Sequence, residues 1–244
     1  MITGIIVALP EELTTLTTKR VEKGQSVSIS EKMMVAYSGA GAKNAQSASE
    51  LLVANGATRL ISWGCAAALS PSLRPGDLTL ADKLVDSDQI EMAVNVQWLD
   101  YCKKLLSQSV TVHTGCLVES KCIVSSSKDK QQLHSTTDAI ALDMESIAIA
   151  KVASQNALPF LAVRVIVDPV NMDLPLAINH SLDEQGDIVI SKLLLFLVLH
   201  PYELPGLIKL GLHFKAARDT LKLVAKQINR LDRFDPPATT ELST

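Results

Sequence analysis

Two neighbouring segments carry carboxylates at positions where an α/β protein could bind a ligand or transfer a proton. Residues 141–146 (ALDMES) place Glu145 at the start of an apolar, alanine-rich helical stretch, and residues 160–168 (FLAVRVIVD) form a buried-type strand that ends on Asp168. Ligands of α/β proteins bind at the carboxyl ends of strands. A carboxyl group that is half shielded from water there keeps a raised pKa and can act as a general acid. The spacing therefore predicts an acid at Asp168 with a second carboxylate beside it.

Each of these two carboxylates also has a purely structural interpretation. Asp168 is followed by Pro169, so it could cap a turn at the end of its strand. Glu145 could be a solvated glutamate in the first turn of a helix, where the helix dipole favours a negative charge. Asp143 suits that second role better, which favours a functional role for Glu145.

Two further segments could contribute to the same site. Glu12 follows the first expected strand in residues 9–12 (LPEE), where it could equally be an ordinary acidic residue of a helix start. Residues 38–41 (SGAG) form a partial glycine-rich loop after a strand, with Gly39 and Gly41. A third matching glycine is missing, so the loop does not match a dinucleotide-binding fingerprint.

Several motifs together resemble one known family. These are residues 62–69 (SWGCAAAL), 73–77 (LRPGD), the Asp-Met-Glu segment at 143–145, Asp168 and residues 201–217. In order and spacing they resemble the nucleoside phosphorylase and nucleosidase superfamily from residue 5 to about residue 223. Within it the chain resembles the methylthioadenosine/S-adenosylhomocysteine nucleosidases, and most of all the hopanoid-associated phosphorylases. The resemblance implies cleavage of an N-glycosidic bond that releases adenine from a 5′-substituted adenosine, adenosylhopane foremost.

The resemblance also implies roles for individual residues. Asp168 would donate a proton to N7 of the departing purine, and Glu12 would position the attacking water. Glu145 would accept both ribose hydroxyls and stabilise positive charge at the anomeric carbon. Met144 would lie under the ribose ring as an adaptable contact.

The remaining pocket residues are also expected from the resemblance. The loop with Gly39 and Gly41 would lie near the sugar and the nucleophile. Gly64 and Cys65 would line the substrate pocket. Residues Ile123 and Val124 would stack on the purine and meet its edge through backbone groups.

The sequence departs from the family pattern at two places. Ala67 and Ala68 stand where related enzymes have glycines, so either this loop adopts a conformation that alanine tolerates or the pocket is altered. Ser62 stands where the phosphorylase branch has an arginine that holds phosphate, and Cys65 stands where a serine is common. We therefore expect water as the nucleophile, with phosphate as the alternative.

Composition indicates a single aliphatic core. The 244 residues are 47% hydrophobic but only 4% aromatic, which favours a parallel-type sheet covered by helices. We predict a three-layer α/β/α sandwich with a mixed central sheet and a C-terminal amphipathic helical appendage. The expected division is a catalytic domain at 1–200, a basic helical segment at 201–234 and a disordered tail at 235–244. A net charge of −3 gives no reason to expect nucleic-acid binding.

Alternation and helical periodicity place the elements around these motifs. We expect strands at residues 2–9, 33–37, 60–62, 77–84, 110–118 and 160–167, and helices at 44–55, 129–136 and 144–156. Residues 64–69 are expected to form a small-residue loop.

The four cysteines show no spacing typical of a zinc site, and we expect neither a metal nor a cofactor. The first residues form a strand pattern and not a signal peptide, which favours a cytoplasmic protein. The longest apolar run, residues 193–199, is much shorter than the ~20 residues that span a bilayer. A small-molecule nucleoside and further copies of the chain, as a homodimer or higher homo-oligomer, are the expected partners.

The C-terminal segment carries a continuous apolar stripe. Seven Lys or Arg against two Asp or Glu between residues 204 and 233 make the segment basic, and its apolar residues recur at intervals of three and four. The stripe consists of Leu207, Leu210, Phe214, Ala217, Leu221, Val224, Ile228 and Leu231. It either packs on the domain or on another subunit, or it lies on anionic lipid as a basic amphipathic helix. The family resemblance favours peripheral contact with the inner face of the membrane.

Overall fold

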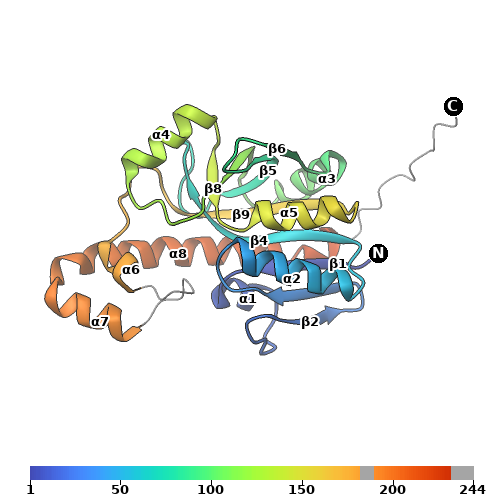
Figure 1. Ribbon diagram of the computed structural model, residues 1–244, viewed down its shortest axis with the longest axis horizontal. Coiled ribbons are helices and arrows are strands. Elements are labelled where there is room, and N and C mark those ends of the chain that lie inside the picture. Colours follow the sequence, from blue (N-terminus) through green and yellow to red (C-terminus); the bar gives the residue numbers. More distant parts are fainter. Residues whose placement is uncertain (182–189, 232–244) are drawn as a thin grey trace, which may run out of the picture.

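The computed structural model describes residues 1–181 and 190–231 (Figure 1). The strands are β1 (Thr3–Val7), β2 (Gln25–Ser30), β3 (Met33–Tyr37), β4 (Arg59–Ala68), β5 (Leu78–Val85), β6 (Glu91–Ala93), β7 (Val112–Glu119), β8 (Ala141–Asp143) and β9 (Phe160–Asp168). The helices are α1 (Pro10–Leu16), α2 (Ala42–Ala54), α3 (Val96–Leu106), α4 (Ser127–Thr137), α5 (Ser146–Gln155), α6 (Leu176–Ser181), α7 (Ile190–Leu199), α8 (Leu204–Ala225) and α9 (Ile228–Leu231), with a 3₁₀ turn η1 at Pro201–Glu203.

The strands form one mixed sheet in the order β2-β3-β1-β4-β8-β7-β5-β6, and β9 pairs with both β4 and β5. Strands β4, β8, β7, β5 and β9 therefore pair in a closed ring. β1 is parallel to β3 and β4, and β4 is parallel to β9. Because parallel strands end on the same side, the carboxyl ends of β1, β4 and β9 meet at one edge of the sheet.

Helices cover the sheet on two sides. α2 and α5 pack against each other, α2 over β1 and β3 and α5 over β4 and β9, while α8 packs against β9 and α1. Figure 1 shows α2 and α5 in front of the sheet and α8 running behind it. The predicted three-layer α/β/α fold with a mixed sheet and a C-terminal helix is confirmed.

The observed elements differ from the prediction at three places. The loop expected at residues 64–69 is wrong, because β4 continues as a strand through Ala68. The helix expected from Met144 begins at Ser146, after the short strand β8. Strands β2, β6 and β8 and helices α3, α6 and α7 were not predicted. β2 is a polar, half-exposed edge strand and β6 and β8 have only three residues each, so none of these strands has a strong apolar pattern.

The apolar stripe of the C-terminal segment packs on the domain. Ala217, Leu221, Val224 and Ile228 are buried and belong to the main hydrophobic core. The first of the two alternatives for the stripe is therefore confirmed over these positions. The predicted tail at residues 235–244 lies outside the described residues, and the division into three segments stays a prediction.

Candidate active site

Arg164 stands at the centre of a buried polar cluster. It lies on β9 and is 2% exposed. Its Nε is 2.6 Å from Oδ2 of Asp143, its Nη2 donates to Oγ of Ser62 at 2.6 Å, and Nη2 is 3.8 Å from Oε2 of Glu145. A buried guanidinium needs such partners, because an unpaired buried charge is strongly destabilising. Arg164 was not among the predicted site residues.

Glu12 joins the end of β1 to β4. It lies in the first turn of α1 and is almost fully buried. Its Oε2 accepts hydrogen bonds from the N–H groups of Ala8 and Leu9, both at 3.0 Å, and its Oε1 accepts from Cys65 N–H at 2.8 Å. Burial raises the pKa of Glu12, while Arg164 and these N–H groups act against that rise. Glu12 is therefore held rigidly, with a raised affinity for a proton.

Gly64 allows Glu12 and Arg164 to approach each other. A methyl group on its Cα would collide with Oε1 of Glu12 and lie 2.6 Å from Nη1 of Arg164. Only a residue without Cβ fits beneath both side chains. The predicted pocket residue Gly64 thus serves the cluster through its small size.

Glu145 connects this cluster to the glycine loop. It is the N-cap residue of α5, and its Oε1 accepts the N–H of Gly41 at 2.9 Å. Burial raises the pKa of Glu145 to about 7, Arg164 opposes the rise and Asp143 adds to it. Gly41 has φ +94°, a left-handed backbone conformation that favours glycine.

Two neighbours of Glu145 have different surroundings. Asp143 is buried on β8, pairs with Arg164 and accepts the Ser146 N–H at 3.2 Å, so the solvated position in a helix's first turn that the sequence favoured for it is wrong. Met144 is partly buried. Gly39, with φ +79°, belongs to the same loop as Gly41, and a Cβ there would collide with Lys23.

Asp168 makes a buried ion pair that the sequence did not reveal. Nζ of Lys130, on α4, is 2.9 Å from each carboxylate oxygen of Asp168. The same Nζ donates to the carbonyls of Pro169 at 3.0 Å and Met172 at 2.6 Å. The Lys130 side chain is fully buried. Burial raises the pKa of Asp168 to about 6, although Lys130 acts in the opposite direction.

The carboxylate cluster around Arg164 and the Asp168–Lys130 pair lie at different positions along β9. Gly64 pairs with Arg164 across the β4–β9 ladder, and Ala67 pairs with Asp168. Arg164 and Asp168 are four positions apart on β9, which is about 13 Å at ~3.3 Å per residue. An elongated ligand could therefore meet Glu12 and Glu145 at one end and Asp168 at the other.

Ile123 and Val124 lie on the α4 side of the site. Both line a cavity of about 560 Å³ together with residues of α4, among them Asp129 and Leu133. Val124 packs against the same small hydrophobic cluster as Ala67. Asp168, Glu12 and Glu145 do not line this cavity, so the structure does not bring the predicted base-contacting residues together with the predicted acid.

The alanines of β4 adopt an ordinary extended conformation. In the described residues, left-handed φ values outside glycine occur at Gln89, Asp138 and Ala157. Ala67 and Ala68 pair with β8, and the β4–β9 register shifts between Ala66 and Ala67. Of the two alternatives for this segment, a conformation that alanine tolerates is confirmed.

An arginine from another strand lies beside Ser62. Ser62 stands in β4 where the phosphorylase branch has an arginine, and Arg164 of the adjacent strand β9 donates to its hydroxyl. Burial holds the pKa of the Cys65 thiol well above its usual range, so this thiol is a poor nucleophile. Within residues 1–181 and 190–231, no group of three or more His, Cys, Asp or Glu side chains is placed to hold a metal ion.

The fold and this cluster together define an α/β protein with a buried polar site built on and beside β4 and β9. The chain belongs to the phosphorylase superfamily, since the family model of that description matches residues 3–187. It is an enzyme of the nucleosidase and nucleoside phosphorylase class.

Similar proteins agree with this assignment. The 5′-methylthioadenosine/S-adenosylhomocysteine nucleosidases of Staphylococcus aureus strains are 25% identical over 211 residues, covering 74% of this chain and 92% of the relative. The Neisseria meningitidis nucleosidase of the same name has a TM-score of 0.70 at 20% identity, covering 93% of this chain and 98% of that chain. The Helicobacter pylori futalosine hydrolase has a TM-score of 0.68 at 18% identity, covering 94% and 96%. The two structures show that the fold is shared.

Proposed function

We propose that this protein cleaves the N-glycosidic bond of a 5′-substituted adenosine and releases adenine. The observation that carries the proposal is Asp168, a buried carboxyl group whose pKa is raised to about 6, at the end of a strand that also carries Arg164. A carboxyl group with that pKa is partly protonated near neutral pH and can deliver a proton. Purines leave poorly as anions, so a proton at N7 is the main chemical requirement.

Glu145 is the proposed ribose ligand. Its Oε1 already accepts the Gly41 N–H, so the carboxylate is fixed in place beside a backbone loop before substrate binds. A carboxylate that accepts the 2′- and 3′-hydroxyls orients the sugar and stabilises charge at the anomeric carbon. Met144, Gly39 and Cys65 complete the proposed sugar pocket, and Ile123 with Val124 the proposed base pocket.

Water is the proposed nucleophile, with Glu12 positioning it. Three carboxylates, those of Glu12, Asp143 and Glu145, surround the single guanidinium of Arg164. An incoming phosphate would meet more negative than positive charge, and Arg164 already donates to Ser62 and Ser146. Neutral water does not meet this repulsion.

Adenosylhopane is the proposed substrate, which places the enzyme in hopanoid metabolism. Support comes from the exposed apolar side chains of α7 and the start of α8, which follow β9 in the chain and suit a substrate with a large apolar 5′ group. The alternative is a soluble nucleosidase that acts on methylthioadenosine or S-adenosylhomocysteine, the substrates in the names of the Staphylococcus aureus relatives. A nucleoside-binding protein without catalysis is a second alternative from the sequence, and membership of this enzyme class argues against it.

One assay separates these candidates. Purified protein is incubated with adenosylhopane, methylthioadenosine or S-adenosylhomocysteine, with and without phosphate, and free adenine is measured. We expect release from adenosylhopane that does not depend on phosphate. Faster release from methylthioadenosine would favour the soluble nucleosidase, and calorimetric binding without release would favour the binding protein. Release from none of the three would contradict the proposed activity.

We also propose that the protein acts as a homodimer or higher oligomer on the cytoplasmic side of the membrane. Light scattering coupled to size exclusion measures the oligomer directly. Fractionation of cells producing the protein would show whether it remains with the membrane at low salt.

A further inference from the structure

Exposed apolar side chains concentrate on one protruding part of the molecule. Figure 1 shows α6, α7 and the first part of α8 extending beyond the sheet, away from α3 and the strand ends near the N-terminus. Thirteen large hydrophobic side chains are exposed in the described residues, and eight of them lie on α7, η1 and the first part of α8. The eight are Leu194, Leu195, Val198, Leu199, Tyr202, Leu204, Ile208 and Leu212. We call them the apolar tip.

Packing on the domain does not account for the apolar tip. Leu204, Ile208 and Leu212 repeat every fourth residue, so they form one stripe on α8. At ~100° per residue, that stripe lies about 200° round the helix from the buried residues Ala217 and Leu221. The face of α8 that meets the domain and the face that carries the apolar tip are therefore opposite.

The side chains of the apolar tip point outward on several sides of the protrusion and do not line a groove. On α7, Leu194 and Leu199 are five positions apart, which separates them by about 140° around the helix. The α7 segment and the chain from Pro201 to Ala225 are bent by 109° relative to each other. A protein partner would cover one face of such a projection, whereas a bilayer can surround it on several sides. This geometry favours lipid over a second copy of the chain.

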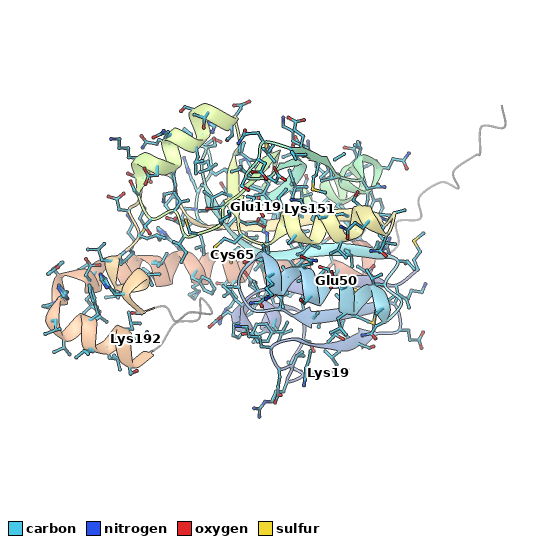
Figure 2. The ribbon with its side chains drawn as sticks, in the orientation of Figure 1. Lys19, Glu50, Cys65, Glu119, Lys151 and Lys192 are labelled. Atoms are coloured by element: carbon cyan, nitrogen blue, oxygen red, sulfur yellow. The ribbon has the colours of Figure 1, made fainter. Side chains whose placement is uncertain are left out.

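Cations lie beside the apolar tip. Arg74 and Lys209 line a cavity of about 510 Å³, together with His134 and His213. Glu203 is the one acidic residue between positions 190 and 216 in the sequence. Figure 2 shows Lys192 at the start of α7, on the same protrusion. Two cationic side chains next to exposed apolar residues match a lipid phosphate next to its acyl chains.

The cavity also adjoins the candidate active site. Pro169, Val170 and Asn171 form part of its wall, and they follow Asp168 directly. The apolar tip and the predicted acid are therefore reached from the same end of the sheet.

We propose that the apolar tip is a docking surface for a phospholipid bilayer that contains anionic lipid. The apolar side chains enter the outer acyl region, and Arg74 and Lys209 meet the headgroup phosphates. No single helix among the described residues is long and apolar enough to cross a membrane, whereas α7 and α8 pass such a test only as a bent pair. Peripheral docking fits that geometry, because the two helices can lie in the interface without spanning it.

Vesicle co-sedimentation tests the proposal without any nucleoside, so its result is independent of the proposed activity. The double variant V198S/L199S removes two exposed side chains of the apolar tip. The matched control I90S/V96S removes two equally apolar residues that are exposed elsewhere, on the β5–β6 turn and α3. With vesicles of phosphatidylcholine and phosphatidylglycerol, we expect V198S/L199S to bind at least ~10-fold more weakly than the parent, because each buried CH₂ contributes to membrane binding. The control should bind as the parent does.

A second pair of measurements separates lipid from protein as the occupant. R74Q/K209Q should weaken binding to vesicles that contain phosphatidylglycerol and leave binding to phosphatidylcholine alone unchanged. The proposal is overturned if the parent protein binds neither vesicle, or if V198S/L199S binds as well as the parent. It is also overturned if V198S/L199S lowers the oligomeric mass in light scattering while vesicle binding is unchanged, since a second copy then covers the apolar tip. Thermal melting of each variant confirms that it is folded.

Discussion

Asp168 is under two opposing influences that together set its chemistry. Burial raises its pKa, and the bidentate contact with Lys130 lowers it, leaving a value of about 6. An isolated aspartate would be almost fully ionised at neutral pH, and a buried one without a partner would stay protonated far above it. Burial and Lys130 together therefore keep the pKa of Asp168 close to the pH at which a general acid must hold and release its proton.

Replacing Asp168 with asparagine tests its role as the acid. D168N should retain nucleoside binding but lose at least ~10²-fold in turnover, because general acid catalysis contributes on that scale. Steady-state adenine release and calorimetric binding measure the two effects separately. D100N, which changes an exposed aspartate on α3, is the control. Full activity in D168N would remove Asp168 from the mechanism.

Lys130 should determine the pH dependence of the reaction. Activity needs protonated Asp168, so it should fall as the pH rises through about 6. K130M removes the charge that lowers the pKa of Asp168, and the fall should move to higher pH. The measurement is kcat/KM between about pH 5 and 9, with the exposed K128M on the same helix as control. K130R keeps the positive charge and should therefore retain the pH profile of the parent. If K130M lowers activity equally at every pH, Lys130 serves only to hold the loop at Pro169 and Met172.

The sequence revealed some members of the site and concealed others. Glu12, Glu145 and Asp168 stand in recognisable motifs at strand ends, so they could be named in advance. Arg164 could also have been suspected, because a charge within a buried strand pattern requires partners. Lys130 gave no signal: α4 is polar, and a lysine there resembles a solvated surface residue until the fold covers it.

At the scale of elements, β4 shows how one position can need glycine while its neighbours do not. Gly64 lies beneath Glu12 and Arg164, whereas Ala67 and Ala68 pair with β8 and have φ values that alanine tolerates. The small-residue run in β4 resembled a loop because its alanines carry little apolar volume. Pairing with β8 and β9 on both sides makes it a strand, and pairing of this kind is tertiary information.

Substitutions in β4 should therefore have unequal effects. G64A should abolish measurable turnover, because its methyl group displaces Glu12 and Arg164 together. A67G should keep activity and lower the free energy of unfolding by about 0.5–1 kcal/mol, the usual cost of glycine within a regular element. Adenine release and urea denaturation measure both variants. Activity in G64A comparable with that of the parent would show that the contact of Glu12 with Arg164 is not needed.

At the scale of the whole molecule, the C-terminal helix shows which structural features sequence periodicity can predict and which it cannot. The intervals of three and four predicted a helix with an apolar stripe, and α8 confirms the helix. Periodicity does not say what covers a stripe, because a domain, a subunit and a bilayer all bury apolar side chains. The residues that remain exposed, on the opposite face of α8 and on α7, were identified only after the chain folded.

Two leucines two positions apart in α8 test this assignment of faces. Leu221 is 1% exposed and packs in the main core, whereas Leu223 is 44% exposed. L221A should lower the free energy of unfolding by about 2–5 kcal/mol, since it leaves a cavity in the core. L223A makes the same chemical change outside the core, and surface substitutions usually stay within about ±0.5 kcal/mol. Chemical denaturation measures the stability of both variants. Folded L221A should bind vesicles as the parent does, because the apolar tip is on the opposite face of α8. If L223A were the more destabilising variant, α8 would pack through the face assigned here to lipid, and the docking surface would have to be abandoned with it.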